Sequence, residues 1–181
     1  MTTVCCPTIG WASESLGRSR NLRRGASETV SQPLTRVHQI RSSALSRSTF
    51  DDLLKQLSAQ PWFGEVSSRL CKFLSYGEDW NGYGEKAISE RSVIGAIIIL
   101  HRIGMGGPKP VVVPVPDGGI QIEWYQGRVE IEVEIPPHGP ALVYMARPDG
   151  SSSEDVVQQM DDPVWDRLHE AITELNVSGV G

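Results

Sequence analysis

The segment that decides the fold is residues 111–147, which read VVVPVPDGGIQIEWYQGRVEIEVEIPPHGPALVYMAR. Apolar and polar side chains alternate along most of it, as they do in strands that bury one face. Asp117-Gly118, Gln126-Gly127 and the segment 136–140 supply turn residues between the alternating runs. The sequence therefore predicts a four-stranded antiparallel β-meander with strands at about 111–116, 120–125, 128–135 and 141–147.

The turns also predict a register for this meander. Two-residue turns at 117–118 and 126–127 and a five-residue turn at 136–140 would place apolar side chains together on one face. The expected pairs on that face are Val115–Ile120, Val113–Ile122, Val111–Trp124, Ile122–Ile131, Trp124–Val129, Val133–Val143 and Ile131–Met145. The expected neighbours on the other face are Glu123–Glu130, Gln121–Glu132, Tyr125–Arg128 and Tyr144–Glu132. Pro114 has no backbone donor, which is typical of an edge strand.

Four helices are expected around the meander, at about 49–59, 62–76, 89–103 and 163–176, because apolar residues recur there at helical spacing. Ser48 or Thr49 is expected to cap the first helix. Asp161 or Asp162 should cap the last, with Pro163 at its first position. The segment 148–153 is rich in proline, glycine and serine and indicates a linker. The prediction is one α+β domain over residues 48–178, with helices packed on one face of the sheet.

The N-terminal segment differs from the rest in charge. Residues 1–48 contain seven arginines and two glutamates, a net charge of +5, whereas residues 49–181 carry a net charge of −10. Residues 1–47 therefore indicate a disordered basic tail, rich in Arg and Ser, that cannot bury enough apolar surface to order itself. Four interpretations stay open: a targeting presequence, a translated upstream extension, a solvated tail, or a nucleic-acid-binding arm using Arg18, Arg20, Arg23 and Arg24.

Several function classes find no support in the sequence. The longest apolar run, Val93–Leu100, is far shorter than the roughly 20 residues that span a bilayer, so no membrane association is expected. The four histidines are scattered and no CxxC occurs, so the sequence predicts no metal site and no cofactor. No Ser-His-Asp or Cys-His arrangement suggests catalytic residues.

The first candidate binding surface is the polar face of the predicted sheet, formed by Glu123, Tyr125, Glu130, Glu132 and Tyr144. Like charges placed side by side on a sheet cost stability. The glutamates either keep the sheet soluble and unaggregated or dock a basic protein. A divalent cation is a third option, although the strand lacks the loop carbonyls of calcium sites.

The second candidate is the loop GEDWNGYG at residues 77–84. Its binding candidates are Asp79, Trp80, Asn81 and Tyr83, because large, partly polar aromatic residues are enriched at binding hot spots. The alternative is structural: the aromatics close the edge of the core while the glycines turn the chain into the next helix.

Three matching segments resemble a family of small, uncharacterised bacterial proteins that share DW-(D/N)-GYG and P-x-x-DGG-I-x-x-EW. The matching residues are Asp79–Gly84, Ile88-Ser89 and Pro114–Trp124, and the chain departs from the pattern at Ala87, where proline is expected. The resemblance covers roughly residues 65–135. It implies a bacterial, cytoplasmic protein but carries no activity.

Taken together, these patterns favour a non-catalytic, acidic protein-interaction module with a basic protein partner. An antitoxin, an immunity protein or a defence-associated accessory protein would be concrete forms of it. One alternative is nucleic-acid binding through the arginine tail. The other is a small hydrolase that uses Asp79 or a Glu123–Glu130 carboxylate pair for acid–base chemistry.

Overall fold

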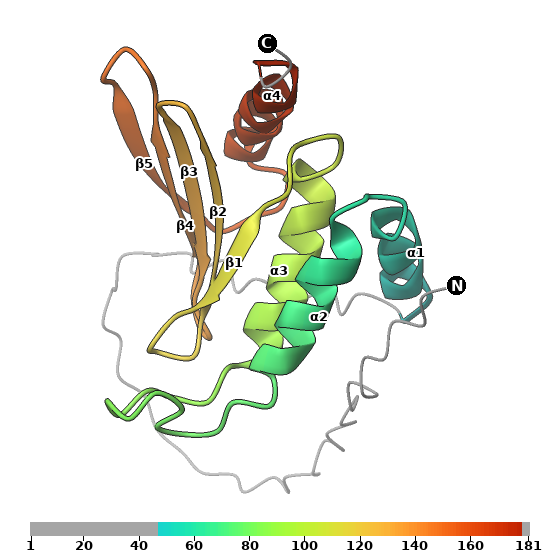
Figure 1. Ribbon diagram of the computed structural model, residues 1–181, viewed down its shortest axis with the longest axis vertical. Helices are drawn as coiled ribbons and strands as arrows, with labels where there is room; N and C mark the ends of the chain where they lie inside the picture. The colour runs from blue at the N-terminus through green and yellow to red at the C-terminus, as the bar shows by residue number, and fades with distance from the viewer. Residues whose placement is uncertain (1–46, 179–181) are drawn as a thin grey trace, which may run out of the picture.

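The computed structural model describes residues 47–178, and residues 1–46 of the predicted tail, including Arg18, Arg20, Arg23 and Arg24, lie outside this range (Figure 1). The described chain contains four helices and five strands. In order these are α1 (Arg47–Leu57), α2 (Phe63–Phe73), α3 (Glu90–Ile103), β1 (Val111–Pro114), β2 (Ile120–Gln126), β3 (Val129–Ile135), β4 (Ala141–Ala146), β5 (Ser152–Val157) and α4 (Pro163–Ser178).

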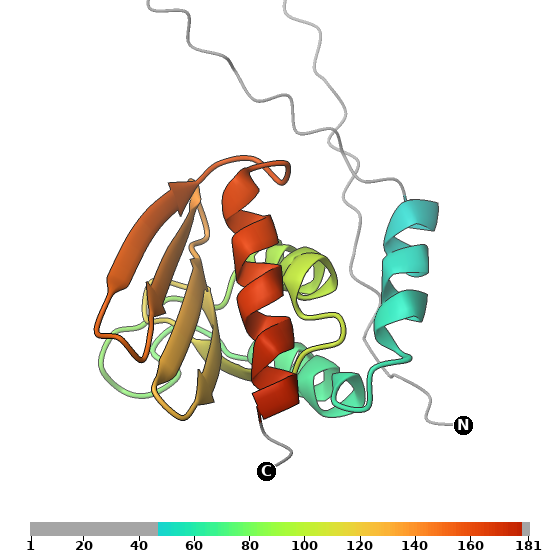
Figure 2. The same ribbon diagram turned by 90° about the horizontal axis from the view of Figure 1, so that it is seen from above.

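The elements form two layers, a sheet and a group of helices on one of its faces (Figure 2). The strands pair in the order β1-β2-β3-β4-β5, all antiparallel. Helices α3 and α4 pack together, α3 also touches β2 and β3, α2 lies against β1, and α1 packs on α3. The predicted α+β class is confirmed, and the prediction of four strands is wrong by one.

The additional strand, β5, takes in residues 152 and 153 of the expected linker, and the rest of that linker is a hairpin turn. The Arg147 N–H donates to the Ser151 carbonyl over 2.9 Å, and the Gly150 N–H donates to the Arg147 carbonyl over 3.0 Å. These bonds turn the chain into a hairpin that leads into β5. Ser153 and Asp155 lie on the helix side of this strand, where the Asp155 carboxylate pairs with Arg167 of α4 at 3.5 Å. Strand β5 therefore lacks the apolar alternation that revealed its neighbours.

The register of β3 with β4 is confirmed, with Val133 opposite Val143 and Ile131 opposite Met145. The predicted register of β1 with β2 is wrong by one residue, because Val112 lies opposite Ile122. Val112 is therefore the buried valine of β1, and Val111 is exposed.

A three-residue connection causes the shift between β1 and β2. The Val115 N–H donates to the Gly119 carbonyl, so three residues rather than two join the strands. Gly118, at φ +93°, adopts the left-handed conformation that this type of bulged turn requires. The Asp117 carboxylate accepts the Gly119 N–H over 2.8 Å and completes the turn.

The register of β2 with β3 differs from the predicted one by two residues. Because a shift of two keeps every side chain on the same face, the apolar and polar faces of both strands are as predicted. Glu123 lies opposite Glu132 rather than Glu130. Tyr125 lies opposite Glu130 rather than Arg128, and Gln121 opposite Glu134. The displacement arises because the turn is Gly127-Arg128, with Gly127 at φ +62°.

The helix ends were predicted with mixed success. The expected cap of α4 is confirmed, since the Asp162 carboxylate accepts the Val164 N–H over 2.9 Å and Pro163 opens the helix. The expected cap of α1 is wrong: that helix already begins at Arg47, so Ser48 and Thr49 lie inside it. Helix α2 covers 63–73 instead of 62–76.

Two tryptophans anchor the sheet to the helices. Trp124 and Trp165 are each 1% exposed. The Trp124 indole donates to the Pro108 carbonyl over 3.2 Å, and the Trp165 indole donates to the Gln159 carbonyl over 2.8 Å. Both buried indoles thus satisfy their polar atoms while burying large apolar areas. Among residues 47–178, no helix combines the length and the apolar character needed to cross a bilayer.

Candidate functional site: the open face of the sheet

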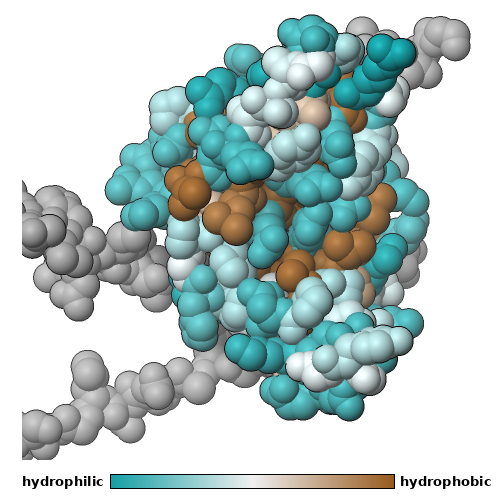
Figure 3. Space-filling model, turned by 90° about the vertical axis from the view of Figure 1, so that its left-hand side faces the viewer, coloured by the Kyte–Doolittle hydropathy of each residue, from teal (hydrophilic) through white to brown (hydrophobic). Residues whose placement is uncertain are grey.

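The helix-free side of the sheet, called the open face here, carries the outward side chains of β2 to β5. No described helix covers it (Figures 1 and 2). Figure 3 views this side and shows a mainly hydrophilic surface broken by apolar patches. Its side chains on these four strands include Gln121, Glu123, Tyr125, Glu130, Glu132, Glu134, Leu142, Tyr144, Glu154 and Val156.

Glu132 stands at the centre of this face. It lies opposite Glu123 of β2 and opposite Tyr144 of β4. The Tyr125 hydroxyl donates to the Glu132 carboxylate over 2.7 Å. The sheet therefore holds two carboxylates directly across from each other, an arrangement that destabilises a sheet.

Partial burial and neighbouring charge perturb two carboxyls on the open face. Burial raises the pKa of Glu123 above its ordinary value, and the charge of Glu132 raises it further. Burial likewise raises the pKa of Glu134, with added repulsion from Asp117 and Glu132. Burial and the hydrogen bond to Glu132 raise the pKa of the Tyr125 phenol, so this group stays a hydrogen-bond donor.

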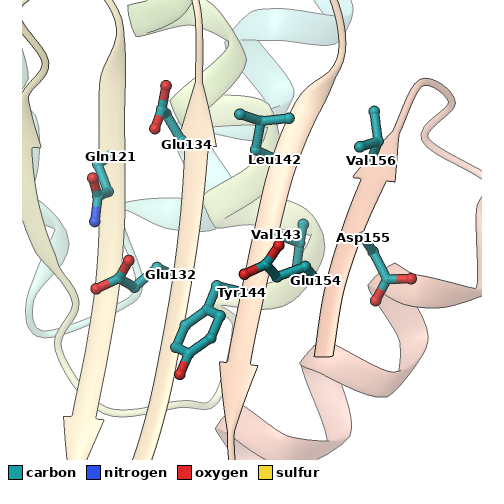
Figure 4. Close-up of a pocket in the computed structure, with 9 residues that line it drawn as sticks. All are labelled: Gln121, Glu132, Glu134, Leu142, Val143, Tyr144, Glu154, Asp155 and Val156. Atoms are coloured by element: carbon teal, nitrogen blue, oxygen red, sulfur yellow. The ribbon is translucent and has the colours of Figure 1, made fainter. Parts of the chain in front are cut away.

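A hollow of about 380 Å³ lies on the open face over β2 to β5 (Figure 4). One side presents the carboxylates of Glu132 and Glu134, whereas the other side presents Leu142 and Val156. Leu142 is 42% exposed and Val156 is 64% exposed. A hollow with apolar and anionic walls suits side chains that combine an apolar stem with a cationic end, such as lysine and arginine.

In the glycine-rich loop, Asp79 and Asn81 hold the backbone. The Asp79 carboxylate accepts the Gly84 N–H over 2.8 Å, and Asn81 accepts the Tyr83 N–H over 3.1 Å. Asp79 itself has φ +57°. Both polar side chains therefore hold the backbone of the loop in its turns.

The two aromatic residues of the loop behave differently. Trp80 is half-buried and stacks on Tyr76, with ring centroids 5.2 Å apart. Tyr83 is 88% exposed. Trp80 thus helps to close the core, and Tyr83 presents its ring to solvent.

The chain that follows this loop docks on the β1–β2 hairpin. The Lys86 N–H donates to the Pro116 carbonyl and the Ser89 N–H to the Gly118 carbonyl, each over 2.9 Å. A Cβ atom at Gly118 would lie 2.7 Å from the Ala87 carbonyl oxygen. Two of the matching segments, Ile88-Ser89 and Pro114–Trp124, therefore meet at a junction of backbone hydrogen bonds.

The structure brings some of the predicted site residues together and separates others. Glu132 and Tyr144 line the hollow, and Glu123, Tyr125 and Glu130 lie on the same face. None of the four loop candidates lines it. The sequence prediction missed seven further lining residues, namely Gln121, Glu134, Leu142, Val143, Glu154, Asp155 and Val156. Alternation marked Gln121 and Glu134 as outward, but only the unpredicted strand β5 completes the hollow.

The proposed catalytic pair Glu123–Glu130 is not a cross-strand pair, because Glu132 takes the position opposite Glu123. Within residues 47–178, no three His, Cys, Asp or Glu side chains converge as metal ligands would. Comparisons with protein-family models, with curated proteins and with solved structures found no match to this chain.

Proposed function

We propose that this protein is a non-catalytic interaction module that binds a basic protein partner through its open face. The observation that carries the proposal is the set of half-buried glutamates around Glu132. The described part of the chain contains three ion pairs, Arg102–Asp166, Lys109–Glu65 and Arg167–Asp155, and none of them includes an open-face glutamate.

A basic partner would relieve a cost that the free protein carries. Glu123 and Glu132 repel each other across two strands, and partial burial weakens their hydration. Lysine or arginine side chains placed over them would offset both effects. Complementary charge would also steer and accelerate the encounter. Tyr144, Leu142 and Val156 would supply the apolar contacts that hold the complex together.

An antitoxin or immunity protein is the concrete form of this proposal, since such a protein neutralises a target by covering it. A bacterial, cytoplasmic setting is part of the same proposal and rests on the family resemblance alone. Loop residue Tyr83, at 88% exposure, is a second contact candidate.

Affinity capture from the native host with two matched variants tests the proposal. The first variant combines Glu123→Gln, Glu132→Gln and Glu134→Gln on the open face. The control neutralises three exposed carboxylates on the helices, by Asp51→Asn, Asp52→Asn and Glu170→Gln. A basic protein identified by mass spectrometry should be retained by the wild type and the control at low salt and released by the open-face variant.

Reconstitution from purified components would then measure the affinity of that protein for each variant. Neutralising the three open-face glutamates should weaken it by roughly tenfold or more, the scale of one or two lost charge pairs. If the open-face variant and the control bind equally well, the open face is not the binding surface and the proposal fails.

A further inference from the structure

Strand β5 is an edge of the sheet, and its backbone directions follow from its hairpin. The bond from the Arg147 N–H to the Ser151 carbonyl makes these residues a hydrogen-bonded pair. In an antiparallel ladder such pairs recur at every second residue. Ser153, Asp155 and Val157 therefore direct their backbone groups toward β4. The N–H and C=O groups of Ser152, Glu154 and Val156 point away from the sheet.

The residues of β5 whose backbone groups point away from β4 are also its exposed residues. Ser152, Glu154 and Val156 are all exposed, and no other described strand pairs with them. Their side chains lie on the open face, next to β4, and Figure 4 shows those of Glu154 and Val156. The edge and the acidic face are therefore one continuous surface.

We propose that β5 binds an extended basic segment of the partner protein as a sixth strand of the sheet. This inference rests on the proposed function and specifies how the partner docks. Main-chain hydrogen bonds to Ser152, Glu154 and Val156 supply the pairing, and alternate side chains of the added strand reach the open face. A lysine or arginine fits beside Glu154, and the apolar stem of the next one on the same face packs beside Val156.

The side chains around β5 favour a basic strand. Val156 lines the hollow on the open face and also a second hollow, together with Gln158, Asp161 and Asp162. Acidic side chains therefore flank the edge along β5 and beyond its end. A strand that carries lysine or arginine at alternate positions meets Glu154 along β5 and Asp161 and Asp162 beyond its end.

A second copy of this chain is the less favourable occupant. Two β5 strands related by a two-fold axis would pair symmetrically about one residue or one point. Centring the pair on Glu154 or on Asp155 places two carboxylates directly opposite each other, which costs stability. Charge thus selects a basic strand over self-pairing in these registers.

A defined peptide and one matched pair of variants test the proposal on the full chain. The probe is a fluorescent ten-residue peptide in which lysine and valine alternate, and binding is measured by anisotropy at low salt. Val156→Pro removes one outward N–H without removing a bond to β4. Val156→Thr keeps the N–H and the branched shape. We expect the proline variant to bind at least tenfold more weakly and the threonine variant to bind within threefold of the wild type.

A second probe keeps the test valid if Val156→Pro disturbs the fold. The same peptide, N-methylated at alternate residues along one edge, cannot pair through that edge and should bind at least tenfold more weakly to the wild type. Equal binding of methylated and unmethylated peptides would overturn strand addition.

The open-face variant (Glu123→Gln, Glu132→Gln, Glu134→Gln) separates the two proposals. Binding that falls in this variant and persists in Val156→Pro overturns strand addition and keeps the acidic face as the binding surface. A wild type that binds no peptide up to about 1 mM overturns strand addition. A β5-dependent dimer in sedimentation equilibrium, abolished by Val156→Pro, would assign the edge to a second copy instead.

Discussion

The two edges of the sheet are closed in different ways. At β1, the bond between Val115 and Gly119 directs the backbone of Val112 and Pro114 outward, and Pro114 has no N–H to offer. At β5, the three residues whose backbone groups point outward, Ser152, Glu154 and Val156, all carry an N–H, and Glu154 adds an exposed carboxylate beside them. Edge strands need protection because their unpaired groups template further pairing.

The hairpin at the β1 edge is held by other residues, whereas the described residues leave open space at the glycine of the hairpin at the β5 edge. The β1–β2 hairpin accepts hydrogen bonds from the N–H groups of Lys86 and Ser89, so it packs against the segment before α3. The β4–β5 hairpin contains Gly150, and nothing lies within 4 Å of a Cβ placed there. At the β1 edge, Pro114 removes one backbone donor whatever the charge of the partner. Carboxylates protect the β5 edge only against partners that are not basic, which makes this protection selective.

The largest expected effect compares the glycines of the two hairpins. Both have positive φ, +93° for Gly118 and +85° for Gly150. Gly150→Ala should cost about 1–2 kcal/mol of unfolding free energy through backbone strain alone. Gly118→Ala adds a collision with the Ala87 carbonyl and should cost about 3 kcal/mol or more. Urea unfolding of both variants measures the difference, and equal losses would show that the β1–β2 hairpin is not docked.

The next effect tests the backbone directions in β5 with two adjacent serines. Ser153→Pro removes an N–H that bonds to β4 and leaves a carbonyl unpaired, which should cost about 2 kcal/mol. Ser152→Pro removes an outward N–H and should cost less than about 1 kcal/mol. Chemical denaturation checks both. The reverse order of stabilities would invert the assignment of outward groups on which strand addition depends.

A smaller effect is the pH dependence of stability that Glu123 and Glu134 on the open face cause. The pKa values of Glu123 and Glu134 are raised from 4.5 in the folded protein, so folding favours their protonated forms. Their contribution to stability is fully present below pH 4.5 and is lost as the pH rises through the raised values. Thermal unfolding should therefore show that the double variant Glu123→Gln, Glu134→Gln is more stable relative to the wild type at pH 7 than it is at pH 4.

The control for this pH effect is Glu90→Gln at the exposed start of α3. It should leave the pH profile of the melting temperature parallel to that of the wild type. A double variant whose profile also stays parallel would show that the two glutamates are not perturbed in solution.

The smallest expected effect on stability comes from opening the β1 edge. Pro114→Val restores an outward N–H and should change the unfolding free energy by less than about 1 kcal/mol. It should, however, permit association through β1, visible as concentration-dependent sedimentation. A variant that stays monomeric would show that docking and α2, rather than proline, protect this edge.

The pattern of single residues was enough to predict several parts of the fold. Alternation along β2, β3 and β4 required one buried face, and the β3–β4 register followed because both strands fill that face with apolar side chains. The cap of α4 was predictable because Asp162 and Pro163 act within one turn of helix. The acidic character of the open face followed from the same alternation.

Only the tertiary structure decided the remaining parts. Strand β5 has a polar inner face because Asp155 meets Arg167, a contact between strand and helix that no local pattern shows. The β1 register depended on a bulged turn at Gly118, which is held by Ser89 from another segment. The hollow and the open edge both depend on β5. Local propensity and alternation thus determined which side chains share a face, whereas contacts between distant segments decided where the sheet ends.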